Sequence, residues 1–175
     1  MNCTAGLVLA LTAIIAASAQ TPTLHFAAAS EWKSTPSSSP MRVAQYALPR
    51  AAGDSEDGEL IVYFFGGQGG SVQANLDRWL GQMEQPDGRP SKAVATTETL
   101  TVNGMKVTVL DVSGKYVAEM APGSPTRHNK PGFRLKAAVV ETAGGPYFVK
   151  LTGPAKTVER WNTAFATFLR SAMYR

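Results

Sequence analysis

Four carboxylates lie close together in the first half of the chain, at Asp54, Glu56, Asp57 and Glu59. Paired carboxylates can act as general acid and base, or bind a hard cation through their oxygen atoms. The run does not have the spacing of a calcium-binding loop, and acidic turns are usually solvated. A small hydrolase that uses carboxylates and a metal is therefore the alternative hypothesis for function, and no residue is assigned as a metal ligand.

Other groups that commonly perform catalysis are scarce. Cys3 is the only cysteine, and the two histidines are His25 and His128. A Ser-His-Asp system needs an imidazole that is held rigidly against the hydroxyl, and neither histidine lies in a segment expected to be rigid. A His-Glu-x-x-His zinc motif is also absent from the sequence. We therefore expect no catalytic residue and no cofactor.

A glycine-rich loop, residues 66–70, separates an apolar strand from a helix. Its residues Gly67, Gly69, Gly70 and Ser71 are candidates for binding an anion, because such loops can present free N–H groups. The loop lacks the lysine of a phosphate-binding loop, and its glycines do not match a dinucleotide fingerprint. We favour the alternative that glycine relieves crowding where the chain leaves the strand.

The charge of the chain is unevenly distributed. The net charge of +4 combines −3 over residues 20–114 with +7 over residues 115–175. Such a split can place a basic face opposite an acidic partner, although it is more often a solvated surface. The candidate binding residues lie in a long loop and the strand that follows it: Arg127, His128, Lys130, Arg134 and Lys136.

Alternation places Arg134 and Lys136 on one face of that strand, opposite Phe133 and Leu135. The partner class that this stretch favours is an anionic protein or an envelope surface. Nucleic acid is not expected as a partner, because the sequence has no basic-aromatic motif and the chain is predicted to be exported.

The N-terminus has the pattern of a secretory signal peptide. Residues 7–17 are apolar except for Thr12, and Ala17-Ser18-Ala19 supplies the small residues that precede a cleavage site. We predict cleavage between Ala19 and Gln20. The alternative is a buried N-terminal helix. The run is too short to span a bilayer, which needs about 20 apolar residues, and no later segment approaches that length.

Cleavage would remove Cys3 and leave an exported, periplasmic or secreted chain that is stabilised by packing alone. We expect this chain to be soluble and to have no lipid anchor. Residues 20–40 are rich in Ser, Thr, Pro and Ala, which predicts a flexible lead-in with room for a short strand at residues 24–26. Residues 41–175 are expected to form a single domain.

The hydrophobic pattern predicts the elements of that domain. Strands are expected at residues 41–48 and 60–65, and the second is continuously apolar, as in a strand covered on both faces. Ser71 is the expected N-cap of an amphipathic helix that runs to Pro86. Asn103-Gly104 predicts a two-residue hairpin turn that sets Val102 opposite Met105.

The last third of the domain is predicted to contain two strands and a helix. The strands, at residues 133–142 and 147–152, meet through Ala143-Gly144-Gly145-Pro146, and their patterns do not settle a register. Pro154 suits the first turn of a helix of about four turns, whose apolar stripe is centred on Trp161.

This order of elements, with the closing segment Tyr147-Phe148-Val149-Lys150-Leu151-Thr152-Gly153-Pro154 and its helix, resembles the Mog1/PsbP-like fold over residues 41–172. The resemblance implies an α+β domain in which an antiparallel sheet lies between helical layers. It also implies a non-catalytic accessory or binding role, by analogy of fold, and it assigns no functional residue. An exported accessory or binding protein is therefore the leading hypothesis, with the envelope hydrolase as the alternative.

Overall fold

The computed structural model describes residues 23–175, so the expected signal peptide lies outside the described residues. Its main feature is an eight-stranded sheet with the order β2-β3-β4-β9-β8-β7-β5, in which β6 also pairs with β7. Every strand pair is antiparallel, which confirms the expected α+β class. The strands are β1 (Leu24–His25), β2 (Lys33–Ser34), β3 (Arg42–Leu48), β4 (Gly58–Phe64), β5 (Met83–Glu84), β6 (Thr96–Val102), β7 (Met105–Tyr116), β8 (Lys130–Thr142), β9 (Gly145–Pro154) and β10 (Met173–Tyr174).

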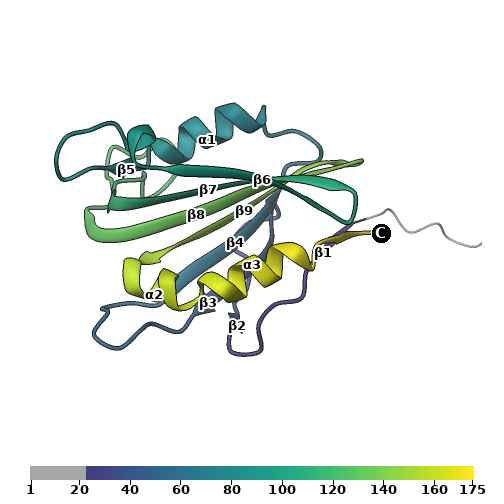
Figure 1. Cartoon of the computed structure of the whole chain (residues 1–175), viewed down its shortest axis with the longest axis horizontal. Helices are drawn as coiled ribbons and strands as arrows, with labels where there is room; N and C mark the ends of the chain where they lie inside the picture. The colour runs from purple at the N-terminus through teal and green to yellow at the C-terminus, as the bar shows by residue number, and fades with distance from the viewer. Residues whose placement is uncertain (1–22) are drawn as a thin grey trace, which may run out of the picture.

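Helices lie on both faces of this sheet (Figure 1). Helix α1 (Val72–Leu80) lies on one face, and α2 (Ala155–Arg160) and α3 (Asn162–Arg170) lie on the other, with a short 3₁₀ turn at Ser91–Ala93. Two clusters of buried side chains fill the layers, one containing Leu76 and Trp79 of α1 and the other Phe165 and Phe168 of α3. The arrangement is the expected α/β/α sandwich.

The β6–β7 hairpin has the predicted register. Val102 pairs with Met105 and Leu100 pairs with Val107. Asn103 and Gly104 both have positive φ, at 47° and 80°, as a type I′ turn requires. The turn chemistry and the apolar pattern therefore select the same pairing.

The two central strands of the sheet, β4 and β9, pair with each other along most of their length. The apolar run Leu60-Ile61-Val62 of β4 is buried, as predicted for a strand covered on both faces. Strand β9 continues from β8 through a tight turn in which Thr142 pairs with Gly145, with no break in register along the pair. The pairing across this turn answers the register question that the sequence left open.

Helix α1 begins as predicted and ends earlier. The Ser71 hydroxyl accepts a hydrogen bond from the Ala74 N–H at 3.2 Å, which caps the first turn. The helix ends at Leu80 because Gly81 takes the C-cap position and the chain then turns back to the sheet. Met83, which fits the helical stripe, instead belongs to β5 and pairs with Tyr116.

The C-terminal helix is interrupted where the sequence predicts a single helix of about four turns. Trp161 has φ −96° and ψ 8°, between α2 and α3. Its indole is buried and donates a hydrogen bond to the Pro49 carbonyl oxygen at 2.8 Å. The helix therefore breaks at the residue that anchors it to the domain.

The segment 23–40 is part of the domain, unlike the flexible lead-in that its composition suggests. Leu24 pairs with Tyr174 of β10, and Lys33 of β2 pairs with Ala47 of β3. The indole of Trp32 is only 5% exposed and packs edge-on against Trp161 at 6.3 Å. Burial of a few large apolar side chains outweighs the polar composition of this segment, and the short strand expected near residue 24 is present.

Candidate functional site

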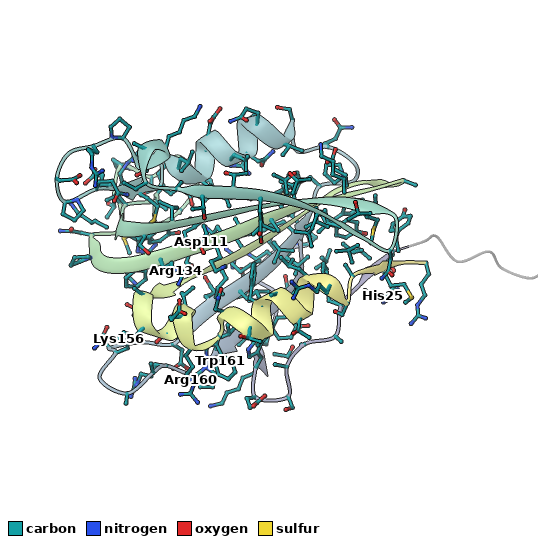
Figure 2. The ribbon with its side chains drawn as sticks, viewed as in Figure 1. His25, Asp111, Arg134, Lys156, Arg160 and Trp161 are labelled. Atoms are coloured by element: carbon teal, nitrogen blue, oxygen red, sulfur yellow. The ribbon has the colours of Figure 1, made fainter. Side chains whose placement is uncertain are left out.

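Arg134 and Lys136 of the basic stretch converge on one carboxylate. The Arg134 guanidinium donates from Nε and Nη2 to the two oxygens of Asp111, at 2.7 and 2.6 Å, and also pairs with Glu159 of α2. The Lys136 ammonium donates to Asp111 at 2.9 Å and to the Asn162 amide oxygen at 2.6 Å. Figure 2 shows Asp111 and Arg134 together beside α2.

This network changes the ionisation of its members. Burial of Asp111 opposes its ionisation, but hydrogen bonds from Arg134 and Lys136 outweigh burial and hold the pKa of the carboxyl below its usual value. The same pairing with Asp111 raises the pKa of Arg134. All three charges are therefore compensated within the fold.

The remaining members of the basic stretch are also engaged. Arg127 forms an ion pair with Glu119 at 3.7 Å, and Lys130 forms one with Glu56 at 2.6 Å. The His128 ring stacks on Tyr116 with centroids 5.2 Å apart. The structure thus brings only Arg134 and Lys136 together, places Arg127, His128 and Lys130 in separate contacts, and matches each of the four cations with a carboxylate. Most of these carboxylates come from distant parts of the chain, so the sequence gave no sign of the pairing.

The glycine-rich loop is tightly packed against the β8–β9 hairpin. Gly67, Gly69 and Gly70 all have positive φ. A Cβ added to Gly69 would lie 2.6 Å from the Phe148 ring, and one added to Gly145 would lie 2.4 Å from the Gly67 Cα. Glycine is therefore required here for close approach, which supports the packing alternative over an anion site.

The four clustered carboxylates have separate structural roles. Asp54 accepts hydrogen bonds from the N–H and hydroxyl of Thr157, at 2.9 and 2.6 Å, at the start of α2. Asp57 accepts from the Arg50 N–H, Glu56 pairs with Lys130, and Glu59 accepts from the Gln45 amide. Over residues 23–175, no group of three or more His, Cys, Asp or Glu is placed to hold a metal ion.

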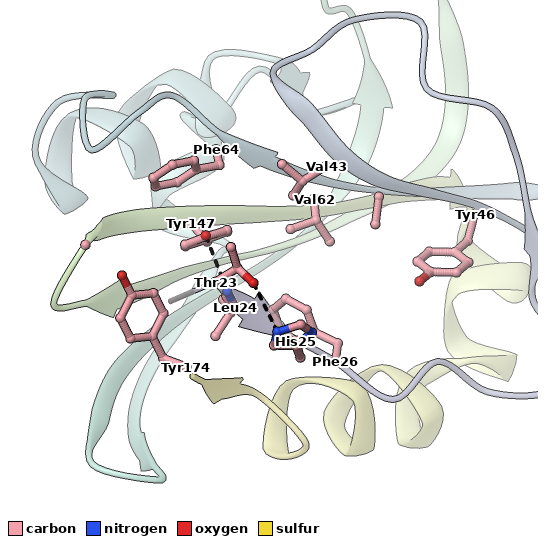
Figure 3. Close-up of a pocket in the computed structure, with 12 residues that line it drawn as sticks. Thr23, Leu24, His25, Phe26, Val43, Tyr46, Val62, Phe64, Tyr147 and Tyr174 are labelled. Atoms are coloured by element: carbon pink, nitrogen blue, oxygen red, sulfur yellow. Dashed lines mark hydrogen bonds between the residues drawn. The ribbon is translucent and has the colours of Figure 1, made fainter. Parts of the chain in front are cut away.

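A cavity lies where β1 and β10, from the two ends of the described chain, meet the main sheet (Figure 3). The cavity has a volume of about 480 Å³. Its walls come from β1, β3, β4, the β8–β9 turn, β9 and β10, and most of its side chains are aromatic or aliphatic. We call it the aromatic pocket, defined by Thr23, Leu24, His25, Phe26, Val43, Ala44, Tyr46, Val62, Phe64, Gly144, Tyr147 and Tyr174.

Ring contacts fix the walls of the aromatic pocket. Phe64 and Tyr147 stack with centroids 4.4 Å apart, and Phe26 stacks on Phe168 of α3 at the same distance. Tyr46 packs edge-on against Phe168 at 6.2 Å. These rings are anchored to the core, so the pocket is preformed. Val43, at the opening, is 51% exposed.

A few polar groups border the aromatic pocket. The Tyr147 hydroxyl accepts a hydrogen bond from the Leu24 N–H at 3.3 Å, and the Thr23 hydroxyl lies 3.0 Å from His25 Nε2. The Tyr174 hydroxyl lies against Gly144, since a Cβ added to Gly144 would be only 2.0 Å from the hydroxyl oxygen. An apolar wall with a small number of polar groups is the usual composition of a small-molecule site.

The sequence alone does not predict the aromatic pocket. Phe26 lies in a segment with a loop-like composition, and Tyr174 lies at the end of the chain. Their proximity depends on the pairing of β1 with β10, two strands of two residues each. The only available signal was the presence of large apolar side chains in the Ser- and Pro-rich lead-in.

Comparison with known proteins identifies the fold. No family model and no curated protein sequence matches the chain. Among solved structures, LpqN of Mycobacterium tuberculosis, described as involved in cell envelope biogenesis, has a TM-score of 0.51 and 12% identity, over 87% of this chain and 83% of LpqN. This likeness shows the fold alone, and the chain has the Mog1/PsbP-like α+β fold.

Two further structures are similar at a lower score. PA94 of Pseudomonas aeruginosa, a protein of unknown function, has a TM-score of 0.49 and 12% identity over 87% of this chain and 97% of that chain. The PsbP protein of Synechocystis sp. PCC 6803, CyanoP, has a TM-score of 0.49 and 12% identity over 93% of this chain and 98% of CyanoP.

None of the helices formed by residues 23–175 is long and apolar enough to cross a membrane.

Proposed function

We propose that this protein is an exported binding protein, without catalysis of its own, that takes a small apolar molecule into the aromatic pocket. The observation that carries the proposal is a preformed cavity of about 480 Å³ with aromatic walls. Pockets that bind small molecules typically measure about 300–1,000 Å³. An apolar molecule that enters this pocket gains about 25 cal/mol for each Å² of apolar surface removed from water.

The polar groups of the pocket suit orientation rather than chemistry. The Tyr147 hydroxyl already accepts the Leu24 N–H, and it retains a proton to donate to a ligand. The Tyr174 hydroxyl and His25 offer further hydrogen bonds at the rim. An apolar molecule that carries one hydroxyl or carbonyl oxygen therefore fits the site best.

Export rests on the signal pattern that ends at Ala19. The description of LpqN as involved in cell envelope biogenesis agrees with an envelope role for this chain, although the likeness itself concerns the fold. A protein that binds apolar molecules outside the cytoplasm could shield them from water during transfer.

The other hypotheses receive less support. A carboxylate-dependent hydrolase would need the acidic side chains to converge, whereas Asp54 and Glu56 contact residues in different elements. An anionic partner for the basic stretch would have to compete with the carboxylates that already pair with Arg134 and Lys136. An apolar ligand needs no such rearrangement.

A titration with the neutral fluorescent probe N-phenyl-1-naphthylamine tests the proposal. The parent chain should show saturable binding with one site. Two substitutions place bulk in the pocket, Val43→Trp at the opening and Ala44→Leu in the wall, and each should weaken binding by about tenfold or more. Met120→Trp adds the same ring at a position that is 60% exposed and outside the pocket, and it should bind like the parent.

Absence of saturable binding to the parent would overturn the proposal. Equal binding by the parent and both pocket variants would also overturn it, because the probe would then occupy another surface. Circular dichroism of each variant should match the parent, so that a loss of binding reports the pocket rather than the fold.

A further inference from the structure

A second cavity lies on the opposite face of the sheet, between α1 and strands β4 and β9. It has a volume of about 190 Å³. The walls combine two cationic side chains, one amide and four aromatic rings. We call it the lysine pocket, defined by Tyr63, Phe65, Arg78, Trp79, Gln82, Phe148 and Lys150.

Lys150 is held in this pocket by neutral groups. Its ammonium donates hydrogen bonds to the Gln82 amide oxygen at 3.3 Å and to the Tyr116 hydroxyl at 3.2 Å. It also lies 5.5 Å from the centre of the Tyr116 ring. Among residues 23–175, no carboxylate lies within ion-pair distance of this ammonium, whereas Lys136 on the neighbouring strand pairs directly with Asp111.

Lys150 has three charged neighbours. Burial lowers the pKa of Lys150 to about 8; the charge of Glu59 opposes that shift, while Arg42 and Arg78 add to it. Arg78 donates to the Asn75 amide oxygen, and Arg42 lies 5.7 Å from the centre of the Tyr63 ring. Two cationic side chains, Arg78 and Lys150, thus line the cavity, and the charges of Arg42 and of one carboxylate, Glu59, also act on Lys150.

The apolar part of the lysine pocket consists of aromatic rings that pack against one another. Phe148 packs edge-on against Trp79 at 6.5 Å and at a tilt against Phe65 at 5.5 Å. Phe65 in turn stacks near Tyr63, with centroids 6.0 Å apart. Trp79 and Phe148 are almost fully buried, so these two walls are held by the core.

We propose that the lysine pocket binds a small organic carboxylate that carries a flat apolar group. The carboxylate would pair with Lys150 and Arg78, and the apolar group would lie among Phe65, Trp79 and Phe148. A ligand anion supplies the countercharge that the buried ammonium lacks, and such charge-assisted hydrogen bonds are stronger than neutral ones. The volume suits a molecule of about one aromatic ring and a carboxylate.

Calorimetric titration of the chain with benzoate tests this site. We expect one saturable site for benzoate at about pH 6.5, where the ammonium is charged, and much weaker binding at about pH 9.5. The pKa of Tyr116 is raised to about 12 and that of Tyr63 is also raised, in both cases chiefly by burial, so both phenols stay neutral over this range. Benzamide, which has the same shape without the charge, should not bind.

Three variants separate the pocket from general charge effects. Lys150→Met keeps the apolar stem and Arg78→Gln changes an exposed side chain, and each should weaken benzoate binding by about tenfold or more. Lys156→Met removes an exposed lysine from α2, on the other face of the sheet, and should bind like the parent. Val43→Trp, which fills the aromatic pocket, should also leave benzoate binding unchanged.

Failure of benzoate to bind the parent at about pH 6.5 would overturn the proposal. Equal binding by the parent, Lys150→Met and Arg78→Gln would overturn it as well. Loss of benzoate binding in Val43→Trp alone would assign the ligand to the aromatic pocket and would therefore contradict a separate carboxylate site.

Discussion

The Asp111 carboxylate and the Arg134 guanidinium form a bidentate ion pair across neighbouring strands, with N–O distances of 2.7 and 2.6 Å. Asp111 lies directly opposite Lys136 in the β7–β8 ladder, so Arg134 reaches it from the diagonal position. About four-fifths of each of the two side chains is shielded from solvent. A pair with this geometry contributes more than an exposed ion pair, because fewer water molecules compete for its charges.

The first prediction concerns this pair. Asp111→Asn should lower the free energy of unfolding by about 1–3 kcal/mol at neutral pH, because it removes the carboxylate that Arg134 and Lys136 share and leaves Lys136 without an ion-pair partner. Urea denaturation measures the change. Asp87→Asn removes the carboxylate of an exposed ion pair and should leave stability nearly unchanged.

The stability difference between the parent and this variant should also depend on pH, in a direction set by the pKa of Asp111. The folded pKa of Asp111 is below its ordinary value of 3.8, so the ionised pair contributes fully above that value and loses its contribution as the pH falls through the folded pKa. The stability difference between the parent and Asp111→Asn should therefore be largest near neutrality and shrink in acid. A difference that grows below about pH 4 would contradict this assignment.

The second prediction concerns the glycine-rich loop. Gly69→Ala should destabilise the fold by more than Gly66→Ala, because both positions have positive φ but only the first brings a Cβ against the Phe148 ring. The loss at Gly66 should be about 1–2 kcal/mol, the cost of a left-handed backbone for alanine. Equal losses in thermal unfolding would show that close packing does not explain the loop.

The third prediction concerns the anchor between the two C-terminal helices. Trp161→Ala should cost about 3–5 kcal/mol, as expected for a large aromatic side chain removed from a core. Trp161→Phe keeps much of the packing and loses the hydrogen bond to the Pro49 carbonyl, so its cost should be smaller. An unchanged denaturant midpoint for the alanine variant would contradict the core role of this residue.

The fourth prediction concerns processing. Protein recovered from the cell that produces it should begin at Gln20, since Ala17-Ser18-Ala19 precedes the expected cleavage site. N-terminal sequencing or intact mass measurement decides this point. Met1 retained on the folded protein in the cytoplasm would contradict export.

The sequence predicted the parts of the fold that depend on local patterns. Asn103-Gly104 fixed the register of its hairpin, and Ser71 marked the start of α1, because turn and cap chemistry act within a few residues. The Mog1/PsbP-like resemblance and the α+β class were confirmed for the same reason, since they follow from the order of these elements.

The candidate sites depend on contacts between distant residues, and these could not be read from the sequence. Glu56 meets Lys130 across 74 positions, and Leu24 meets the Tyr147 hydroxyl across 123. The basic stretch looked available for a partner because its carboxylates lie elsewhere in the chain. The lead-in looked flexible because its polar composition concealed Trp32, which the core buries.

Isotope-edited nuclear magnetic resonance of the labelled full chain with N-phenyl-1-naphthylamine is the most direct test of the central claim. The aromatic pocket predicts through-space contacts from the probe to the methyl groups of Val43 and Val62 and to the rings of Phe64 and Tyr147. These contacts should disappear in Ala44→Leu and persist in Met120→Trp. Contacts to Trp79 and Phe148 in the lysine pocket instead, or no contact to either cavity, would contradict the binding of an apolar molecule in the aromatic pocket.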